Sequence, residues 1–93
     1  MNYKPLFSLG RIVGTPGSLC ALEKNNQSIA ELLNRHSQGD WGELCDEDKA
    51  ENEFSIKNGL RIMSAYSLED KTKIWIITEA DRSATTILLP EEY

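Results

Sequence analysis

The sequence contains very few of the residues on which most metal sites depend. It has one histidine, His36, and two cysteines, Cys20 and Cys45, which stand 25 positions apart. A structural zinc site needs paired cysteine or histidine ligands at short spacing, so no metal site is predicted, and no other cofactor is expected. We expect both cysteines to be buried free thiols, because a structural disulfide is unusual in a cytosolic protein.

The familiar signatures of catalysis and of membrane insertion are missing as well. The 93 residues contain no glycine-rich phosphate loop, no GxSxG elbow and no HExxH motif. No apolar run approaches the roughly 20 residues that span a bilayer, and the first residues lack the apolar centre of a signal peptide. We therefore expect a cytoplasmic protein without membrane contact, while the question of enzymatic activity stays open.

The acidic side chains are concentrated in one stretch of the chain. The formal net charge is −5, and residues 40–56 alone carry seven acidic side chains against one basic residue, Lys49. Binding to duplex nucleic acid is not expected of such a chain, because it would have to neutralise phosphates with lysine and arginine. A chain of this length forms one hydrophobic core, so residues 1–93 are predicted to be a single domain.

The last third of the sequence predicts three consecutive β-strands. Leu60 to Ser67, Lys73 to Glu79 and Ala84 to Leu89 are rich in isoleucine, leucine, threonine and aromatic residues, and charged turn formers separate them. If Asp81 and Arg82 form the second turn, the strands pair in one register. In that register four pairs of residues face each other: Ile76 with Ile87, Thr78 with Thr85, Trp75 with Leu88, and Ile77 with Thr86.

The earlier part of the chain predicts one strand and two or three helices. Leu6 to Val13 is typical of a strand that bends at Gly10, and Thr15 followed by Pro16 favours a helix start. Ser28 and Glu31 form the pattern of a capping box before a second helix. Asp46 is the predicted cap of a third helix, which Gly59 ends. We expect the buried side of this helix at Ala50, Phe54 and Ile56.

These elements predict an α+β domain. We expect an N-terminal strand, two to three helices and then a three-stranded antiparallel meander. All strands are predicted to lie in one sheet, because an isolated strand would leave its backbone groups unpaired. The helices are predicted to cover one face of that sheet.

One set of residues is compatible with a small metal-free ribonuclease. His36 is the side chain that titrates near neutral pH, Arg82 or Arg61 would hold a phosphate, and Thr85 or Thr86 would orient it. Helices that precede an antiparallel sheet are also found in the barnase, colicin and RelE-like toxin nucleases. The simpler interpretation is a surface or helix-capping histidine beside ordinary turn residues.

A second set of residues favours protein binding. Asp40 and Trp41 lie in a loop, where a tryptophan either covers the core or offers a platform for a ligand. Glu47, Asp48 and Glu51 belong to the acidic helix, which is either a solvated face or a surface for a basic protein partner. The acidic helix is the binding face that we prefer.

Two segments carry a resemblance to a known family. RHSQGDWGELCDEDKAEN and GLRIMSAYSLEDKTKIWIITEADRSATTILLPEEY resemble small bacterial proteins found on plasmids, phages and other mobile elements. Members carry names such as plasmid-related protein or type I restriction endonuclease subunit M. The resemblance extends from about Leu6 to Tyr93 and implies an accessory protein of a mobile element, without implying any catalytic residue. The chain has no Asn/Asp-Pro-Pro-aromatic loop for a flipped base, so methyltransferase activity is not expected.

Overall fold

A β-meander forms the centre of the molecule, as the sequence predicts. In the computed structural model, which describes residues 4–93, β2 (Ile62–Ser67), β3 (Lys73–Thr78) and β4 (Ala84–Leu88) follow one another as antiparallel neighbours. The predicted register is confirmed across β3 and β4: the structure pairs Ile76 with Ile87, Thr78 with Thr85, Trp75 with Leu88 and Ile77 with Thr86. The alternation of side chains along these strands determines which residues enter the core.

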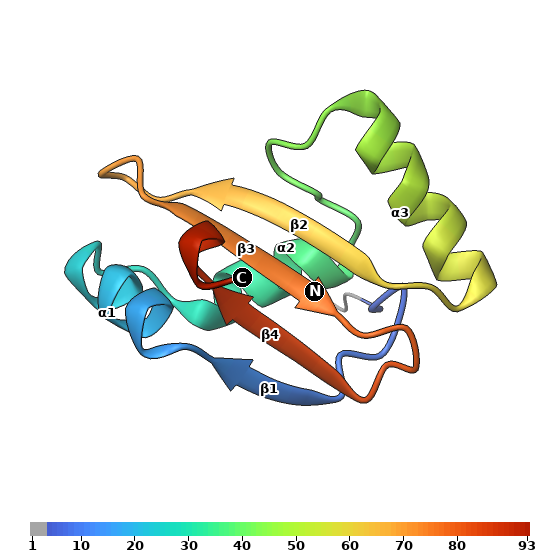
Figure 1. Ribbon diagram of the computed structural model, residues 1–93, viewed down its shortest axis with the longest axis horizontal. Helices are drawn as coiled ribbons and strands as arrows, with labels where there is room; N and C mark the ends of the chain where they lie inside the picture. Colours follow the sequence, from blue (N-terminus) through green and yellow to red (C-terminus); the bar gives the residue numbers. More distant parts are fainter. Residues whose placement is uncertain (1–3) are drawn as a thin grey trace.

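The complete sheet has four strands and is mixed, so its description as a three-stranded antiparallel meander is too narrow. The strand β1 (Arg11–Gly14) pairs with β4 in parallel, which gives the order β1-β4-β3-β2 (Figure 1). The predicted strand from Leu6 to Val13 is also too long. Gly10 adopts a φ of +64°, and a Cβ placed there would lie 2.4 Å from the carbonyl oxygen of Arg82. The chain turns at this contact, and regular pairing begins only after it.

The three helices begin close to the predicted residues. Thr15 caps α1 (Pro16–Lys24) by accepting from the backbone of Ser18, and Ser28 caps α2 (Ile29–Ser37) by accepting from the backbone of Ala30. The predicted capping box is not formed among the described residues, because Ser28 bonds the second helical residue and not the amide of Glu31. The helix α3 (Asp46–Asn58) starts after Cys45, so Asp46 is its first residue rather than its cap. Gly59 ends it in the left-handed conformation, as expected.

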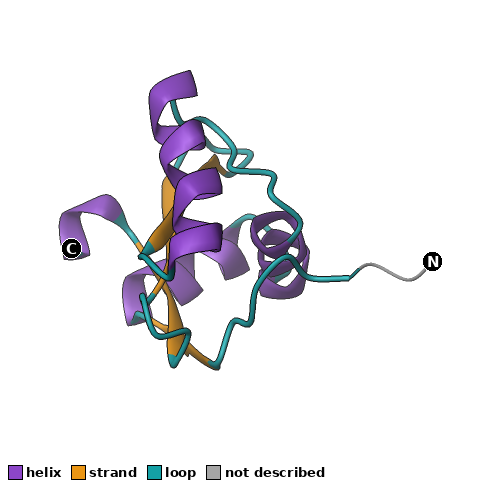
Figure 2. Cartoon of the chain, turned by 90° about the vertical axis from the view of Figure 1, so that its right-hand side faces the viewer, coloured by secondary structure: helices purple, strands orange, loops and turns teal. Residues whose placement is uncertain are grey.

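The helices do not all cover one face of the sheet. The helix α2 lies behind the sheet, whereas α3 runs beside the outer strand β2 (Figure 1). Seen along the edge of the sheet, the C-terminal 3₁₀ turn η1 (Pro90–Glu92) lies on the side opposite to α2 (Figure 2). The main core joins α1 and α2 to one face of the strands through Leu22, Leu32, Tyr66, Leu68, Ile74, Ile76 and Ile87.

Two expectations about burial are wrong. The fully buried residues of α3 are Asn52 and Ser55, while Ala50 is exposed and Phe54 is 54% exposed. Of the predicted buried side only Ile56 is partly buried, against Phe7, Trp41 and Ile62. Because α3 lies at the edge of the sheet, Asn52 meets the backbone of Met63, and a polar residue suits that contact. Both cysteines are free, as expected, but they are exposed rather than buried.

Candidate functional site

A groove between α3 and β2 contains two of the acidic residues that the sequence singles out. Its volume is about 260 Å³, and it is lined by Leu44, Asp48, Glu51, Asn52, Arg61 and Met63. We call it the acidic groove. Leu44 and Met63 give it apolar walls beside the carboxylates of Asp48 and Glu51. The groove is therefore complementary to a lysine or arginine side chain, which has an aliphatic stem and a positively charged end.

Asn52 positions the acidic groove by pairing with the outer edge of β2. Its Nδ2 donates to the carbonyl oxygen of Met63 over 2.7 Å, and its Oδ1 accepts from the amide of Met63 over 3.1 Å. The side-chain amide thus replaces the backbone of a neighbouring strand and satisfies both groups of Met63. Because Asn52 is buried, this pair fixes α3 in register with the sheet.

Three carboxylates of α3, those of Glu47, Asp48 and Glu51, make no ion pair within residues 4–93. Glu47 and Asp48 lie in the first turn of α3, where negative charge is favourable beside the positive end of the helix dipole. Both are exposed, and so is Glu51. Within residues 4–93 the two ion pairs of the structure lie elsewhere. These three side chains therefore remain available to a cation from another molecule.

Arg61, at the other wall of the groove, is held by the C-terminal residue. Its Nη2 donates to the hydroxyl of Tyr93 over 2.5 Å, and its guanidinium carbon lies 5.5 Å from the centre of the Tyr93 ring. The ring of Tyr93 meets Trp75 edge-on at 5.8 Å. The predicted phosphate ligand Arg61 is therefore engaged with an aromatic pair on the face of the sheet opposite to α2.

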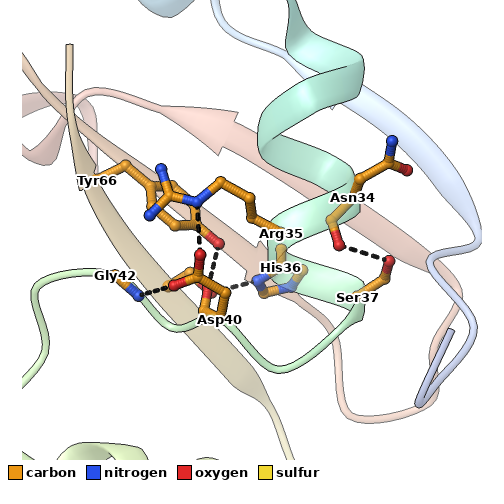
Figure 3. A network of polar contacts seen from close by, with 8 residues as sticks. Asn34, Arg35, His36, Ser37, Asp40, Gly42 and Tyr66 are labelled. Carbon is orange, nitrogen blue, oxygen red and sulfur yellow. Dashed lines mark hydrogen bonds and ion pairs between the residues drawn. The ribbon is translucent and has the colours of Figure 1, made fainter. Parts of the chain in front are cut away.

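Asp40 belongs to a polar network that fastens the loop after α2 to the sheet (Figure 3). Its carboxylate accepts from Nε of Arg35 over 2.6 Å and from the amide of Gly42 over 3.2 Å, and its backbone oxygen accepts from the hydroxyl of Tyr66 over 2.6 Å. The guanidinium of Arg35 lies 4.4 Å from the centre of the Tyr66 ring. The hydrogen bond from Arg35 lowers the pKa of Asp40, so the network holds a carboxylate.

Trp41 covers the core and does not form an exposed platform. Its ring is buried against Phe7 and Ile62, and its Nε1 donates to Glu53 of α3 over 2.9 Å. The next residue, Gly42, has a φ of +74°, and a Cβ there would lie 1.9 Å from the carbonyl oxygen of Ala65. Asp40 and Trp41 thus bring the loop against β2 beside the acidic groove, and their own polar groups are already bonded.

His36 is fully buried, with 0% of its surface exposed. Its Nδ1 lies 2.5 Å from the hydroxyl of Ser64, and its Nε2 lies 2.9 Å from the hydroxyl of Thr78. Phe7 and Trp41 meet the imidazole edge-on at 5.2 and 5.9 Å. Burial lowers the pKa of His36 to about 4, so the ring is neutral at pH 7.

The hydrogen bonds determine which nitrogen of His36 carries the proton. The hydroxyl of Thr85 donates to the backbone oxygen of Leu9 over 2.7 Å, so Thr78, 2.7 Å away, must donate to Thr85. The proton of Thr78 is then committed, and Nε2 of His36 must donate to Thr78. Nδ1 accepts from Ser64. We call the series Ser64, His36, Thr78, Thr85 and Leu9 the buried polar chain; it crosses the sheet from β2 to the residues before β1.

Arg82 binds backbone carbonyls and has no direct contact with His36. Its Nη1 donates to the carbonyl of Leu60 over 2.6 Å and its Nη2 to that of Ser55 over 2.9 Å. These contacts tie the β3–β4 hairpin to the end of α3. The hairpin pair Thr85 and Thr86 is split, because Thr85 is buried in the polar chain and Thr86 points to the opposite face.

Of the predicted catalytic set, the structure links only His36 and Thr85, through Thr78, and structural hydrogen bonds occupy both. Arg82, Arg61 and Thr86 do not bond to His36. Acid–base catalysis needs an imidazole that reaches the substrate directly or through one water, and His36 offers no exposed atom. Sequence reasoning missed Ser64, Thr78 and Asn52. Ser64 and Thr78 share the strand phase of buried isoleucines, and this phase is the signal that could have predicted a buried polar chain.

Comparison with known proteins adds no function: no family model matches the chain, and no curated protein or solved structure is similar to it. The resemblance to proteins of mobile elements stays a prediction. Within the part of the chain that the structure describes, no cluster of ligating side chains could hold a metal ion. None of the helices formed by residues 4–93 is long and apolar enough to cross a membrane.

Proposed function

We propose that this chain is a binding protein that acts through contact with a basic partner protein, and that the acidic groove is its binding site. The observation that carries the proposal is the set of exposed carboxylates of Glu47, Asp48 and Glu51, which form no ion pair within residues 4–93. The resemblance stated above adds that the chain is an accessory protein of a mobile genetic element. Its partner would then come from the host or from that element.

The shape of the acidic groove supports a lysine or arginine side chain as the group that enters it. The aliphatic stem would lie against Leu44 and Met63, and the charged end would reach Asp48 and Glu51. Exposed ion pairs contribute about 0.2–1 kcal/mol each, so several of them are needed for a useful contact. The acidic first turn of α3 extends the negative surface beyond the groove and would speed association with a basic partner.

The arrangement around His36 argues against its use in the alternative function, a metal-free ribonuclease. The imidazole is buried and neutral, and both of its nitrogens are bonded within the fold. The donors of Arg82 are directed at backbone carbonyls, so a phosphate would have to displace them. No observation of the described residues favours the ribonuclease function over the binding function.

A charge-reversal pull-down tests the proposal. The triple variant Glu47→Lys, Asp48→Lys and Glu51→Lys is compared with a control that reverses Glu23, Glu69 and Glu91, which are exposed elsewhere. Both variants change the net charge by the same amount, so unspecific charge effects cancel. We expect the first variant to lose about tenfold or more of the captured partner, as three ion pairs would supply. Equal capture by the two variants would contradict the proposal.

A further inference from the structure

The outer edge of β1 is unpaired within residues 4–93. The amides of Arg11 and Thr15 donate to the carbonyl oxygens of Ser83, just before β4, and of Ile87, within it. Because successive residues of a strand point their backbone groups to opposite sides, the groups of Ile12 and Gly14 point away from the sheet. No hydrogen bond to them exists among the described residues, and no other element lies beyond this edge in Figure 1.

The side chains along this edge are unusually apolar for an exposed position. Ile12 and Val13 are each 42% exposed, and Leu19 of α1 is 45% exposed. Ile12 stands on the face that α2 covers, since it pairs with Thr85, while Val13 pairs with Thr86 on the opposite face. Edge strands that stay single are usually very short or carry charged side chains, a proline or a bulge. The strand β1 has four residues and carries Arg11, but its two central residues, Ile12 and Val13, are apolar and it has no proline.

We propose that β1 pairs with β1 of a second copy of this chain, antiparallel about a two-fold axis at Val13, to form a continuous eight-stranded sheet. In this register Ile12 of one copy lies opposite Gly14 of the other, and their outward amides and carbonyls form four hydrogen bonds across the axis. A register centred on Ile12 would bring Gly10 into the ladder, and Gly10 has left-handed backbone. A register centred on Gly14 would place Pro16, which has no amide proton, opposite Ile12.

In this register the side chains along β1 of one copy pack against those of the other copy. Gly14 has no side chain, and Leu19 of the same copy fills the space over it, with Cδ2 2.8 Å from where a Cβ would lie. In this register Ile12 of the second copy would lie against the exposed side chain of Leu19. On the opposite face, Val13 would meet Val13 at a non-hydrogen-bonded position, where paired side chains come closest.

The charges favour a second copy over an unrelated extended peptide. Arg11 is exposed and makes no ion pair within residues 4–93. In the proposed register it lies opposite Thr15 of the other copy, whose hydroxyl bonds the carboxylate of Glu92 over 2.5 Å. Arg11 and Glu92 therefore meet twice across the axis. The acidic groove lies at the opposite edge of the sheet, beside β2, so pairing through β1 leaves it free.

Sedimentation equilibrium at chain concentrations from about 10 to about 500 µM tests for a species of twice the 10.5 kDa chain mass. Val13→Lys places two ammonium groups against each other at the axis, and we expect it to sediment as a monomer throughout. Its control is Phe54→Lys, which adds the same charge at an exposed apolar residue of α3. A wild-type chain that stays monomeric at 500 µM, or a Val13→Lys variant that still dimerises, would overturn the proposal.

Disulfide trapping tests the register itself. In a chain with Cys20 and Cys45 replaced by serine, Val13→Cys places its thiols at a directly opposed pair, within the Cα separation of about 4.4–6.8 Å that a disulfide requires. Ile12→Cys places them diagonally, more than about 7 Å apart. We expect mild oxidation to link the first variant and not the second. Linking of the Ile12 variant alone would show another register, and linking of neither would show that the edge stays open.

Discussion

The two edges of the sheet are built in opposite ways. At the β2 edge, Asn52 bonds both backbone groups of Met63, and the loop at Gly42 bonds both groups of Ala65 through the oxygen of Trp41 and the amide of Glu43. At the β1 edge the corresponding groups have no partner among residues 4–93. An exposed edge is a template for pairing with another chain. The chain therefore closes the β2 edge with residues of α3 and of the loop at Gly42, and it leaves the backbone groups of the β1 edge available to another chain.

The largest loss of stability is expected from a substitution at Gly42, where the loop after α2 contacts β2. Gly42→Ala adds a Cβ 1.9 Å from the oxygen of Ala65 at a φ of +74°, so both the clash and the backbone conformation oppose it. We expect the free energy of unfolding to fall by about 4 kcal/mol, measured by urea denaturation. Gly59→Ala is the control, because its φ is +64° with no atom within 4 Å. It should cost only about 1 kcal/mol, and equal losses would show that the β2 edge is not closed by contact.

The buried polar chain joins the two edges, and its histidine makes the stability depend on pH. The folded pKa of His36 is about 4 and the unfolded value is 6.5, so between these pH values the unfolded chain binds a proton that the folded chain does not. Stability therefore falls as the pH falls from 6.5 towards 4, by roughly 3 kcal/mol in total.

His36→Gln isolates this contribution, because glutamine can bond Ser64 and Thr78 but does not titrate. The difference in unfolding free energy between wild type and variant, measured from pH 7 to pH 4, should shrink or reverse as the pH falls. The carboxylates titrate equally in both proteins and cancel in the difference. A difference that is constant with pH would contradict a buried neutral His36.

Asn52→Ala opens the β2 edge without adding a clash. The amide and the carbonyl of Met63 both lose their partner, and we expect a loss of about 2 kcal/mol in unfolding free energy. Asn58→Ala is the matched control on the same helix, because the exposed amide of Asn58 bonds only Phe54 of its own helix. We expect it to cost less than about 0.5 kcal/mol. Similar losses in both variants would mean that Asn52 does not close the edge.

Val13→Lys, at the open edge, should have the smallest effect on stability. Val13 is partly exposed, so we expect its replacement to change the unfolding free energy of the monomer by less than about 0.5 kcal/mol, measured below 5 µM. A loss of 2 kcal/mol or more would show that Val13 packs within its own fold, and the contrast between the two edges would fail.

The sequence predicts the strands of the meander and their register because β3 and β4 offer apolar pairs on both faces, Ile76 with Ile87 on one and Trp75 with Leu88 on the other. It also predicts the caps at Thr15 and Ser28, whose hydrogen bonds are local. The polar contacts of Asn52, Arg82 and His36 span 11, 27 and 42 positions, respectively, and no local pattern indicates them. For the same reason His36 is predicted at the surface and found in the core. The exposed acidic face of α3 could be predicted, whereas the groove beside it depends on how α3 meets β2.

Amide hydrogen exchange tests the contrast between the two edges most directly. In a dilute sample, we expect the amides of Met63 and Ala65 to be protected by Asn52 and Trp41, while those of Ile12 and Gly14 exchange at nearly the rate of an open chain. Raising the protein concentration should then increase the protection of the Ile12 and Gly14 amides and leave that of the Met63 and Ala65 amides unchanged. Protection of Ile12 in the dilute monomer, or exchange of Met63 as fast as that of Ile12, would contradict a sheet with one closed and one open edge.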